Sequence, residues 1–279
     1  MAYKRILTVQ DISCIGQCSM TVALPILSAC GHETCILPTA VLSTHTGGFG
    51  MPHMKGLTEE FSGIVDHWEK QKFSFDVVYT GYLGNTEHMK HVKRIFNTMM
   101  AFGSVRIVDP AMADHGKLYS GFDGTYVSAM KELCESADMI LPNITEACLL
   151  TDTPYREEID EQFIAELLEK LERICALVVL TGVGYQPEET GVMVSQNGQR
   201  WYYAQKKIPK SFHGTGDVFA SSFIGAWQQG KTIEEAVKIA VDYTAACIEK
   251  TWKEPAHWYG VKFEAALPGL IKELFPEEI

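Results

Sequence analysis

The chain has little positive charge and no long hydrophobic run. Its 279 residues include 24 Lys and Arg against 35 Asp and Glu, which gives a formal net charge of −11. A nucleic-acid surface needs clustered Lys and Arg, so this composition argues against a nucleic-acid partner. A membrane-spanning helix needs ~20 apolar residues in a row. The sequence therefore predicts neither a nucleic acid nor a membrane as a partner.

A secretory signal and metal-binding cysteine pairs are also lacking. The first apolar run, residues 6–9, ends before Asp11 and is too short for a signal peptide, so we expect a cytoplasmic protein. The eight cysteines form no C-x-x-C pair and most have apolar neighbours, which predicts small buried hydrophobes. Zinc binding by Cys14 and Cys18 is the alternative, and it lacks further ligands at suitable spacing.

The pattern of apolar residues predicts an α/β fold. Strands are expected over residues 5–9, 34–37, 77–79, 105–108, 139–141 and 177–180. Helices are expected between them, over residues 19–29, 58–71, 86–100, 126–135 and 159–174. Apolar strands separated by helices indicate a doubly wound, mainly parallel sheet flanked by helices.

The last third of the chain shows a different pattern. Asn197 and Gly198 lie between two strand-like runs, residues 191–195 and 200–204, and an Asn-Gly pair is a strong hairpin signal. We therefore expect an antiparallel pair after the parallel strands. Three further helices are expected over residues 216–229, 232–250 and 262–274. No linker or repeat interrupts the chain, so one domain over residues 1–279 is the simplest account.

The expected strands end in polar residues, at the edge where open α/β sheets bind ligands. These residues are Asp11, His45, Thr46, Tyr82, Asp109, Asp114, Asn143, Glu146, Thr181 and Gly182. Each also has a structural explanation: Asn143, for example, is a suitable helix N-cap, with Glu146 completing a capping box. Together the carboxylates Asp109, Asp114 and Glu146, with Asn143, offer the oxygen ligands of a Mg²⁺ ion, with water between.

The most informative segment is Gly214-Thr215-Gly216-Asp217, directly before an apolar helix. The first N–H groups of a helix lack intrahelical partners and carry partial positive charge. Glycines there allow a phosphate to approach the amides. A carboxylate in the same turn repels phosphate, so Asp217 is better interpreted as a base that accepts the proton of an attacking alcohol. An ordinary helix start with a glycine turn is the alternative.

In these motifs the chain resembles the ribokinase-like superfamily, and within it the pyridoxal (vitamin B6) kinases. The resemblance covers nearly the whole length and is carried by residues 8–10 with Gly16, 43–47, 80–82, 109–110 with Asp114, 142–143 with Glu146, and 214–217. It implies a cytoplasmic, dimeric kinase that transfers phosphate from ATP, with Mg²⁺, to the 5′-hydroxymethyl group of pyridoxal, pyridoxamine or pyridoxine.

The resemblance also implies a role for each matched position. Asp217 is the implied base, and Gly214, Thr215 and Gly216 form the anion hole for the γ-phosphate. Asp11, His45, Thr46 and Tyr82 are expected at the vitamin, with Tyr82 stacking on its ring. Asp109, Asn143, Glu146, Thr181 and Gly182 are expected at ATP and its metal. Tyr119 is expected to border a site for a monovalent cation such as K⁺.

Several positions depart from the family pattern. Asp11 stands where these kinases commonly have Ser, which suggests a preference for the aminomethyl group of pyridoxamine; an Asp that caps the next turn is the alternative. Gly48 replaces a Tyr and predicts a more mobile loop, and Leu141 replaces a Thr, which removes a hydroxyl from the implied cation site.

Two other functions remain open from the sequence. The hydroxymethylpyrimidine kinases of thiamine synthesis share the fold and use a similar flat heteroaromatic alcohol. The residues Thr44-His45-Thr46-Gly47, and an Asp217 that is not followed by Cys, favour the vitamin B6 reaction. A non-catalytic sensor of B6 or nucleotide is the remaining alternative, although it would not need to retain Asp217 and Glu146.

Overall fold

The computed structural model describes residues 3–276, which group into two compact units. Unit 1 comprises residues up to Leu57 and from Ile208 onward, and unit 2 comprises Thr58–Lys207. No helix in the described part of the chain is long and apolar enough to cross a membrane.

Unit 1 contains three strands, covered by helices from both ends of the sequence. Strand β1 (Arg5–Ser13) pairs in parallel with β2 (Glu33–Leu42), and β2 pairs antiparallel with the short β3 (Met54–Gly56). The helices are α1 (Met20–Ala29), α7 (Thr215–Gln228), α8 (Ile233–Thr251) and α9 (Leu267–Leu274), with the 3-10 turn η1 (Phe263–Ala265) before α9.

Helices α1 and α7 pack closely because Gly225 has no side chain. A Cβ atom on Gly225 would lie 2.4 Å from the sulfur of Cys30, at the end of α1. The Gly225 carbonyl pairs with Nε2 of His32 at 3.0 Å, and Gln229 Nε2 donates to the Cys30 carbonyl at 2.8 Å. These contacts hold the C-terminal end of α7, whose first turn carries Asp217, against the first βα unit.

Unit 2 contains a parallel group of strands continued by an antiparallel hairpin. Its strand order is β11-β10-β9-β8-β5-β4, with bounds β4 Phe75–Thr80, β5 Met100–Val108, β8 Met139–Ile140, β9 Leu177–Val183, β10 Glu189–Gln196 and β11 Gln199–Lys206. Pairs β4–β5, β5–β8 and β8–β9 are parallel, whereas β9–β10 and β10–β11 are antiparallel. The hairpin turns at Asn197 and Gly198, which both have positive φ, as the Asn-Gly signal predicts.

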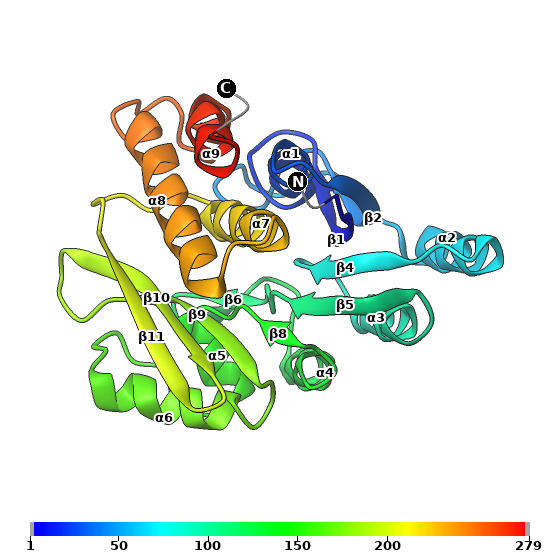
Figure 1. The fold of residues 1–279 in the computed structure, drawn as a ribbon, viewed down its shortest axis with the longest axis horizontal. Helices are drawn as coiled ribbons and strands as arrows, with labels where there is room; N and C mark the ends of the chain where they lie inside the picture. The colour runs from blue at the N-terminus through cyan, green and yellow to red at the C-terminus, as the bar shows by residue number, and fades with distance from the viewer. Residues whose placement is uncertain (1–2, 277–279) are drawn as a thin grey trace. The chain divides into compact units, whose positions relative to one another are not determined.

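The helices of unit 2 form a row along one face of its strands (Figure 1). They are α2 (Thr58–Gln71), α3 (Thr86–Thr98), α4 (Gly124–Cys134), α5 (Ile144–Leu150) and α6 (Glu161–Leu171). Two short strands, β6 (Ala113–Asp114) and β7 (Lys117–Leu118), form a separate antiparallel pair after β5.

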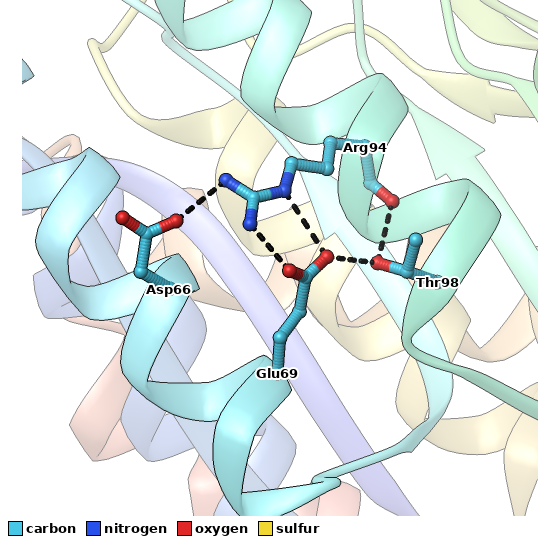
Figure 2. A network of polar contacts seen from close by, with 4 residues as sticks. All are labelled: Asp66, Glu69, Arg94 and Thr98. Atoms are coloured by element: carbon cyan, nitrogen blue, oxygen red, sulfur yellow. Dashed lines mark hydrogen bonds and ion pairs between the residues drawn. The ribbon is translucent and has the colours of Figure 1, made fainter.

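A polar network joins α2 to α3 at the surface (Figure 2). Arg94 donates from Nη1 to Asp66 Oδ1 at 2.7 Å and from Nε to Glu69 Oε1 at 3.1 Å, and its Nη2 also contacts Glu69. Thr98 donates to the same Glu69 oxygen at 2.7 Å. The paired guanidinium–carboxylate contact fixes the relative position of the two helices.

Most predicted elements are present, and the last helix differs. The sequence predicts one helix over residues 262–274, but the structure has η1, a break at Ala266, and then α9. Pro268 lies at the start of α9. Proline has no N–H and its ring clashes with the carbonyl four residues earlier, so a continuous helix through Pro268 is disfavoured.

Candidate active site

The start of α7 has the geometry of an anion-binding turn. Gly214 is the N-cap, with a left-handed φ of 79°, and a Cβ atom there would lie 1.9 Å from the Gln17 carbonyl oxygen. A Cβ atom on Gly216, in contrast, would have nothing within 4 Å. Gly214 is therefore required by the fold, whereas Gly216 leaves open space beside the first amides of the helix, where an anion is favoured.

Asp217 lies in this first turn and is held from outside the helix. Its Oδ2 accepts the backbone N–H of Ser19 at 2.9 Å. Removal from water, with a smaller contribution from the charge of Asp11, raises the pKa of Asp217 to about 7. A carboxylate with this pKa is a stronger base than an ordinary Asp, and about half of it is ionised at pH 7.

Asp11 is the other carboxylate of unit 1 that the sequence predicts for the site, and it lies within strand β1. It is 5% exposed and accepts a hydrogen bond from the Ser13 hydroxyl at 2.9 Å. The Ser19 side chain also bonds to it, and burial raises the pKa of Asp11. Ser19 therefore contacts both carboxylates, through its N–H and through its hydroxyl. No sequence signal singles out Ser19, since a serine before a helix is an ordinary N-cap.

The loop after β2 places His45 and Thr46 in the same unit as the two carboxylates. His45 is buried and Thr46 is exposed. Nε2 of His45 pairs with the Tyr259 carbonyl at 2.9 Å, and Nδ1 accepts the N–H of Gly47 at 3.0 Å. The His45 ring also lies 5.1 Å from the ring of His213, the residue before Gly214.

In unit 2, Asn143 and Glu146 form a complete capping box at the start of α5. Asn143 Oδ1 accepts the Glu146 N–H at 2.9 Å, and Glu146 Oε2 accepts the Asn143 N–H at 2.9 Å. Glu146 Oε1 also accepts the N–H of Met112 at 3.1 Å, and Asn143 Nδ2 donates to the Ala113 carbonyl at 2.9 Å. The prediction that Asn143 is a helix N-cap and that Glu146 completes a capping box is confirmed. The bonds to Met112 and Ala113 also hold the loop after β5 against the start of α5.

Glu146 is a buried carboxylate with a raised pKa. It is 2% exposed, and burial, with repulsion from Asp114, raises its pKa to about 8. Nearby positive charge would favour the ionised form of such a buried carboxylate. Within residues 3–276 no three His, Cys, Asp or Glu side chains are grouped as direct ligands of a metal ion.

The other predicted residues of unit 2 lie at strand ends. Thr181 lies on β9, where its N–H donates to the Pro142 carbonyl at 2.9 Å, and the next residue, Gly182, is exposed with a φ of 76°. The bridge between Asn143 and Thr181 brings these two predicted ATP residues together.

Tyr82 follows β4 and is the first ring of an aromatic stack. Phe122 lies 5.4 Å from Tyr82, at an interplanar angle of 27°, and 3.6 Å from Tyr126. One face of Tyr82 is therefore taken by Phe122. No sequence signal identifies Phe122, which follows β7 in an irregular segment.

Unit 1 thus brings together Asp11, His45, Thr46 and residues 214–217, which are the residues predicted for the alcohol and the phosphate in transit. Unit 2 holds Asp109, Asn143, Glu146, Thr181 and Gly182, predicted for the nucleotide, together with Tyr82. Tyr82, although predicted for the alcohol, belongs to unit 2.

Comparison with known proteins finds relatives along most of the chain. Residues 39–260 match the family model described as phosphomethylpyrimidine kinase. A candidate phosphomethylpyrimidine kinase from Bacteroides thetaiotaomicron, solved in a crystal form with pyridoxal, is 34% identical, with 96% of this chain and 95% of that chain covered and a TM-score of 0.90. Pyridoxal kinase from Lactobacillus plantarum is 29% identical, with coverage of 98% and 99% and a TM-score of 0.90.

A third relative is the hydroxymethylpyrimidine/phosphomethylpyrimidine kinase of Bacillus subtilis. It is 28% identical over 179 residues, which are 63% of this chain and 64% of the relative. The match to the Lactobacillus structure over nearly all of both chains confirms the predicted fold class.

Proposed function

Because the chain belongs to the phosphomethylpyrimidine kinase family, we propose that it transfers the γ-phosphoryl group of ATP to the 5′-hydroxymethyl group of a vitamin B6 compound. Membership of the family makes it a phosphotransferase. The choice of vitamin B6 is supported by two similar structures, one a pyridoxal kinase and the other solved with pyridoxal.

The observation that carries the proposal is the position and pKa of Asp217. The carboxylate lies in the first turn of α7, beside the open space at Gly216, and its pKa is raised to about 7. In the proposed step it accepts the hydroxyl proton while the alcohol oxygen bonds to the γ-phosphorus and the bond from phosphorus to the ADP oxygen breaks. The amides of residues 215 and 216 would stabilise the charge of the phosphoryl group in transit.

Asp11, Thr46 and Tyr82 are the residues proposed to bind the alcohol. Thr46 is exposed on its loop, and Tyr82 has one face taken by Phe122, so the proposed stacking uses the other face. Asp11 would interact with a substituent of the pyridine ring. Its bonds to Ser13 and Ser19 fix the carboxylate in place beforehand.

The nucleotide would be held by unit 2. Mg²⁺ carried by ATP would face Asp109 and Glu146 through water, and its charge would offset that of the phosphates. Thr181 and Gly182, at the end of β9, would contact the phosphates. The capping box with Asn143 keeps the carboxylate oxygens of Glu146 in fixed positions.

Phosphorylation of hydroxymethylpyrimidine is the second candidate function. It is favoured by the description of the matching family and by the Bacillus relative. Both substrates are flat heteroaromatic rings with a hydroxymethyl group, so Asp217 and the α7 turn suit either one. The choice between the two substrates would therefore depend on the residues that contact the ring.

An assay of ADP release decides between these functions. The purified protein is incubated with ATP, Mg²⁺ and, separately, pyridoxal, pyridoxamine, pyridoxine or hydroxymethylpyrimidine. We expect kcat/KM to be higher for at least one B6 compound than for the pyrimidine. Asp217→Asn is the matched control and should lower kcat by about 10²–10⁴, the usual contribution of a general base. A higher kcat/KM for the pyrimidine would reverse the assignment, and no ADP release with any alcohol would favour a sensor.

A further inference from the structure

Two segments of unit 1 that are distant in sequence are joined by the imidazole of His45. The first is the loop after β2, residues 43–50, which we call the glycine loop. The second is residues 257–260, part of the connection between α8 and η1, which we call the strap. Because Nδ1 of His45 accepts the Gly47 N–H, the proton of the neutral ring is on Nε2, which donates to the strap carbonyl of Tyr259 at 2.9 Å.

The contact surfaces of the two segments fit closely because glycines face rings. A Cβ atom on Gly48 would lie 2.6 Å from the ring of Trp258. Gly16, in the loop after β1, also faces the glycine loop, because a Cβ atom there would lie 2.1 Å from the ring of His45. Phe49 packs on Trp258, with ring centroids 4.6 Å apart. The ring of Trp258, from the strap, occupies the space beside Gly48.

The strap is also joined to the loop that supports the start of α7. His257 Nε2 pairs with Gln17 Oε1 at 2.8 Å, and Gln17 Nε2 donates to both carboxylate oxygens of Glu264 at 3.0 Å. The carbonyl of the same Gln17 lies against Gly214. The glycine loop, the strap and the anion-binding turn are therefore connected through direct contacts.

The position of His45 links this arrangement to the substrate side of the site. Gly47, whose N–H donates to His45, lies against the ring of His213, next to Gly214. Both ring nitrogens of His45 have protein partners and the side chain is 6% exposed. Hydrogen bonding to a substrate would break one of these bonds. The geometry thus favours positioning over direct substrate binding.

We infer that His45 is a positioning residue that latches the glycine loop to the strap, and that the strap residue Trp258 forms part of the alcohol-binding site. The latch holds the glycine loop against His213, next to the α7 turn. The inference about substrate rests on the proposed function, whereas the latch itself is a property of unit 1. The neutral imidazole is required because one nitrogen accepts and the other donates.

Two substitutions separate the two hydrogen bonds of His45. In His45→Asn the side-chain oxygen replaces Nδ1 and retains the bond to Gly47, but the bond to Tyr259 is lost. In His45→Gln the amide nitrogen reaches the position of Nε2 and can still donate to Tyr259. Trp258→Ala removes the ring from the strap; Trp258 is 41% exposed, so this variant is expected to fold. His67→Asn changes an exposed imidazole on α2 and serves as the control.

Amide hydrogen exchange and steady-state kinetics are measured on the full chain. His45→Asn should speed exchange about tenfold in residues 43–50 and 257–260 and raise KM for the alcohol by a similar factor, with kcat and KM for ATP within about twofold of wild type. A tenfold change corresponds to ~1.4 kcal/mol, within the range for one hydrogen bond. His45→Gln should restore most of the protection, and Trp258→Ala should raise KM for the alcohol without changing KM for ATP.

Wild-type exchange in His45→Asn would overturn the latch, whatever the substrate proves to be. Faster exchange with an unchanged KM for the alcohol would leave the latch but remove the strap from the binding site. If His45→Asn does not fold, wild-type KM in Trp258→Ala overturns the role of the strap. If no alcohol is phosphorylated by the wild type, the proposed function fails, and the exchange data still test the latch.

Discussion

The backbone N–H of Ser19 donates to Oδ2 of Asp217 at 2.9 Å, although the two residues are 198 positions apart. Ser19 has a φ of 53°, in the left-handed region that few non-glycine residues adopt, and it directly precedes α1. This conformation lets its N–H reach Asp217 while its hydroxyl bonds to Asp11. The proposed base is thus oriented by the N-terminal βα unit.

The pH dependence of turnover should follow the pKa of Asp217. The base works only when ionised and its pKa is raised to about 7, so kcat/KM should be near its plateau above pH ~8 and fall about tenfold per pH unit well below pH 7. Because the charge of Asp11 contributes to the raised pKa, Asp11→Asn should shift the midpoint of this profile to lower pH. A profile with a midpoint near pH 4 would contradict the assignment of Asp217.

Asp217→Asn should stabilise the fold at neutral and alkaline pH. The pKa of Asp217 is higher in the folded protein than in the unfolded chain, where a free Asp titrates near 3.8. The folded state therefore binds the proton more tightly, and ionisation destabilises it progressively from pH ~4 to above pH 7. A tenfold difference in proton affinity between the two states corresponds to ~1.4 kcal/mol. The asparagine variant should have a higher Tm than wild type at pH 8, and the difference should shrink toward pH 4.

Arg94→Lys provides the control for this stability measurement, since it weakens the surface network of α2 and α3 (Figure 2) without changing the α7 turn. It should lower Tm slightly, less so in high salt, and its dependence on pH between 4 and 8 should follow wild type. A Tm difference for Asp217→Asn that is constant from pH 4 to pH 8 would disprove the linkage.

Two glycines of the α7 turn should respond in opposite ways to substitution by alanine. Gly214→Ala meets the Gln17 carbonyl and has a positive φ, so it should lower the free energy of unfolding by at least ~1–2 kcal/mol. Gly216→Ala meets nothing and lies inside a helix, where alanine is favoured by ~0.5–1 kcal/mol. Its methyl group would nevertheless lie beside the proposed path of the phosphate, so kcat should fall. Denaturant unfolding measures the stability of both variants, and the ADP assay measures the kcat of Gly216→Ala. A wild-type kcat in a stable Gly216→Ala variant would argue against the anion hole.

Asp11 is expected to set the preference among B6 compounds. A buried carboxylate near the ring favours the aminomethyl group of pyridoxamine over the aldehyde of pyridoxal. Asp11→Ser should therefore lower the ratio of kcat/KM for pyridoxamine to that for pyridoxal. Ser13→Ala removes a bond to Asp11 but not its charge, and should change the ratio less. An unchanged ratio in Asp11→Ser would leave Asp11 as a structural residue.

The resemblance to the pyridoxal kinases, inferred from the motifs, is confirmed by relatives and structures over most of the chain. The motifs succeed because each is a short segment whose local geometry demands particular residues. Gly214, for example, needs a positive φ and no side chain. The apolar pattern predicts that strand β1 ends at Val9, but the strand continues to Ser13, because the structure buries Gln10, Asp11 and Ser13. A pattern of apolar residues does not reveal a stretch of strand whose buried residues are polar.

The order of strands and helices, the Asn-Gly hairpin and the glycine-rich start of α7 follow from the sequence alone, since these depend on local conformation and on the periodicity of apolar residues. The folded structure was needed to establish that Ser19 holds Asp217, that Phe122 covers one face of Tyr82, and that both nitrogens of His45 are used within the protein. These contacts join segments far apart in the chain. Their geometry depends on packing, which no spacing in the sequence records.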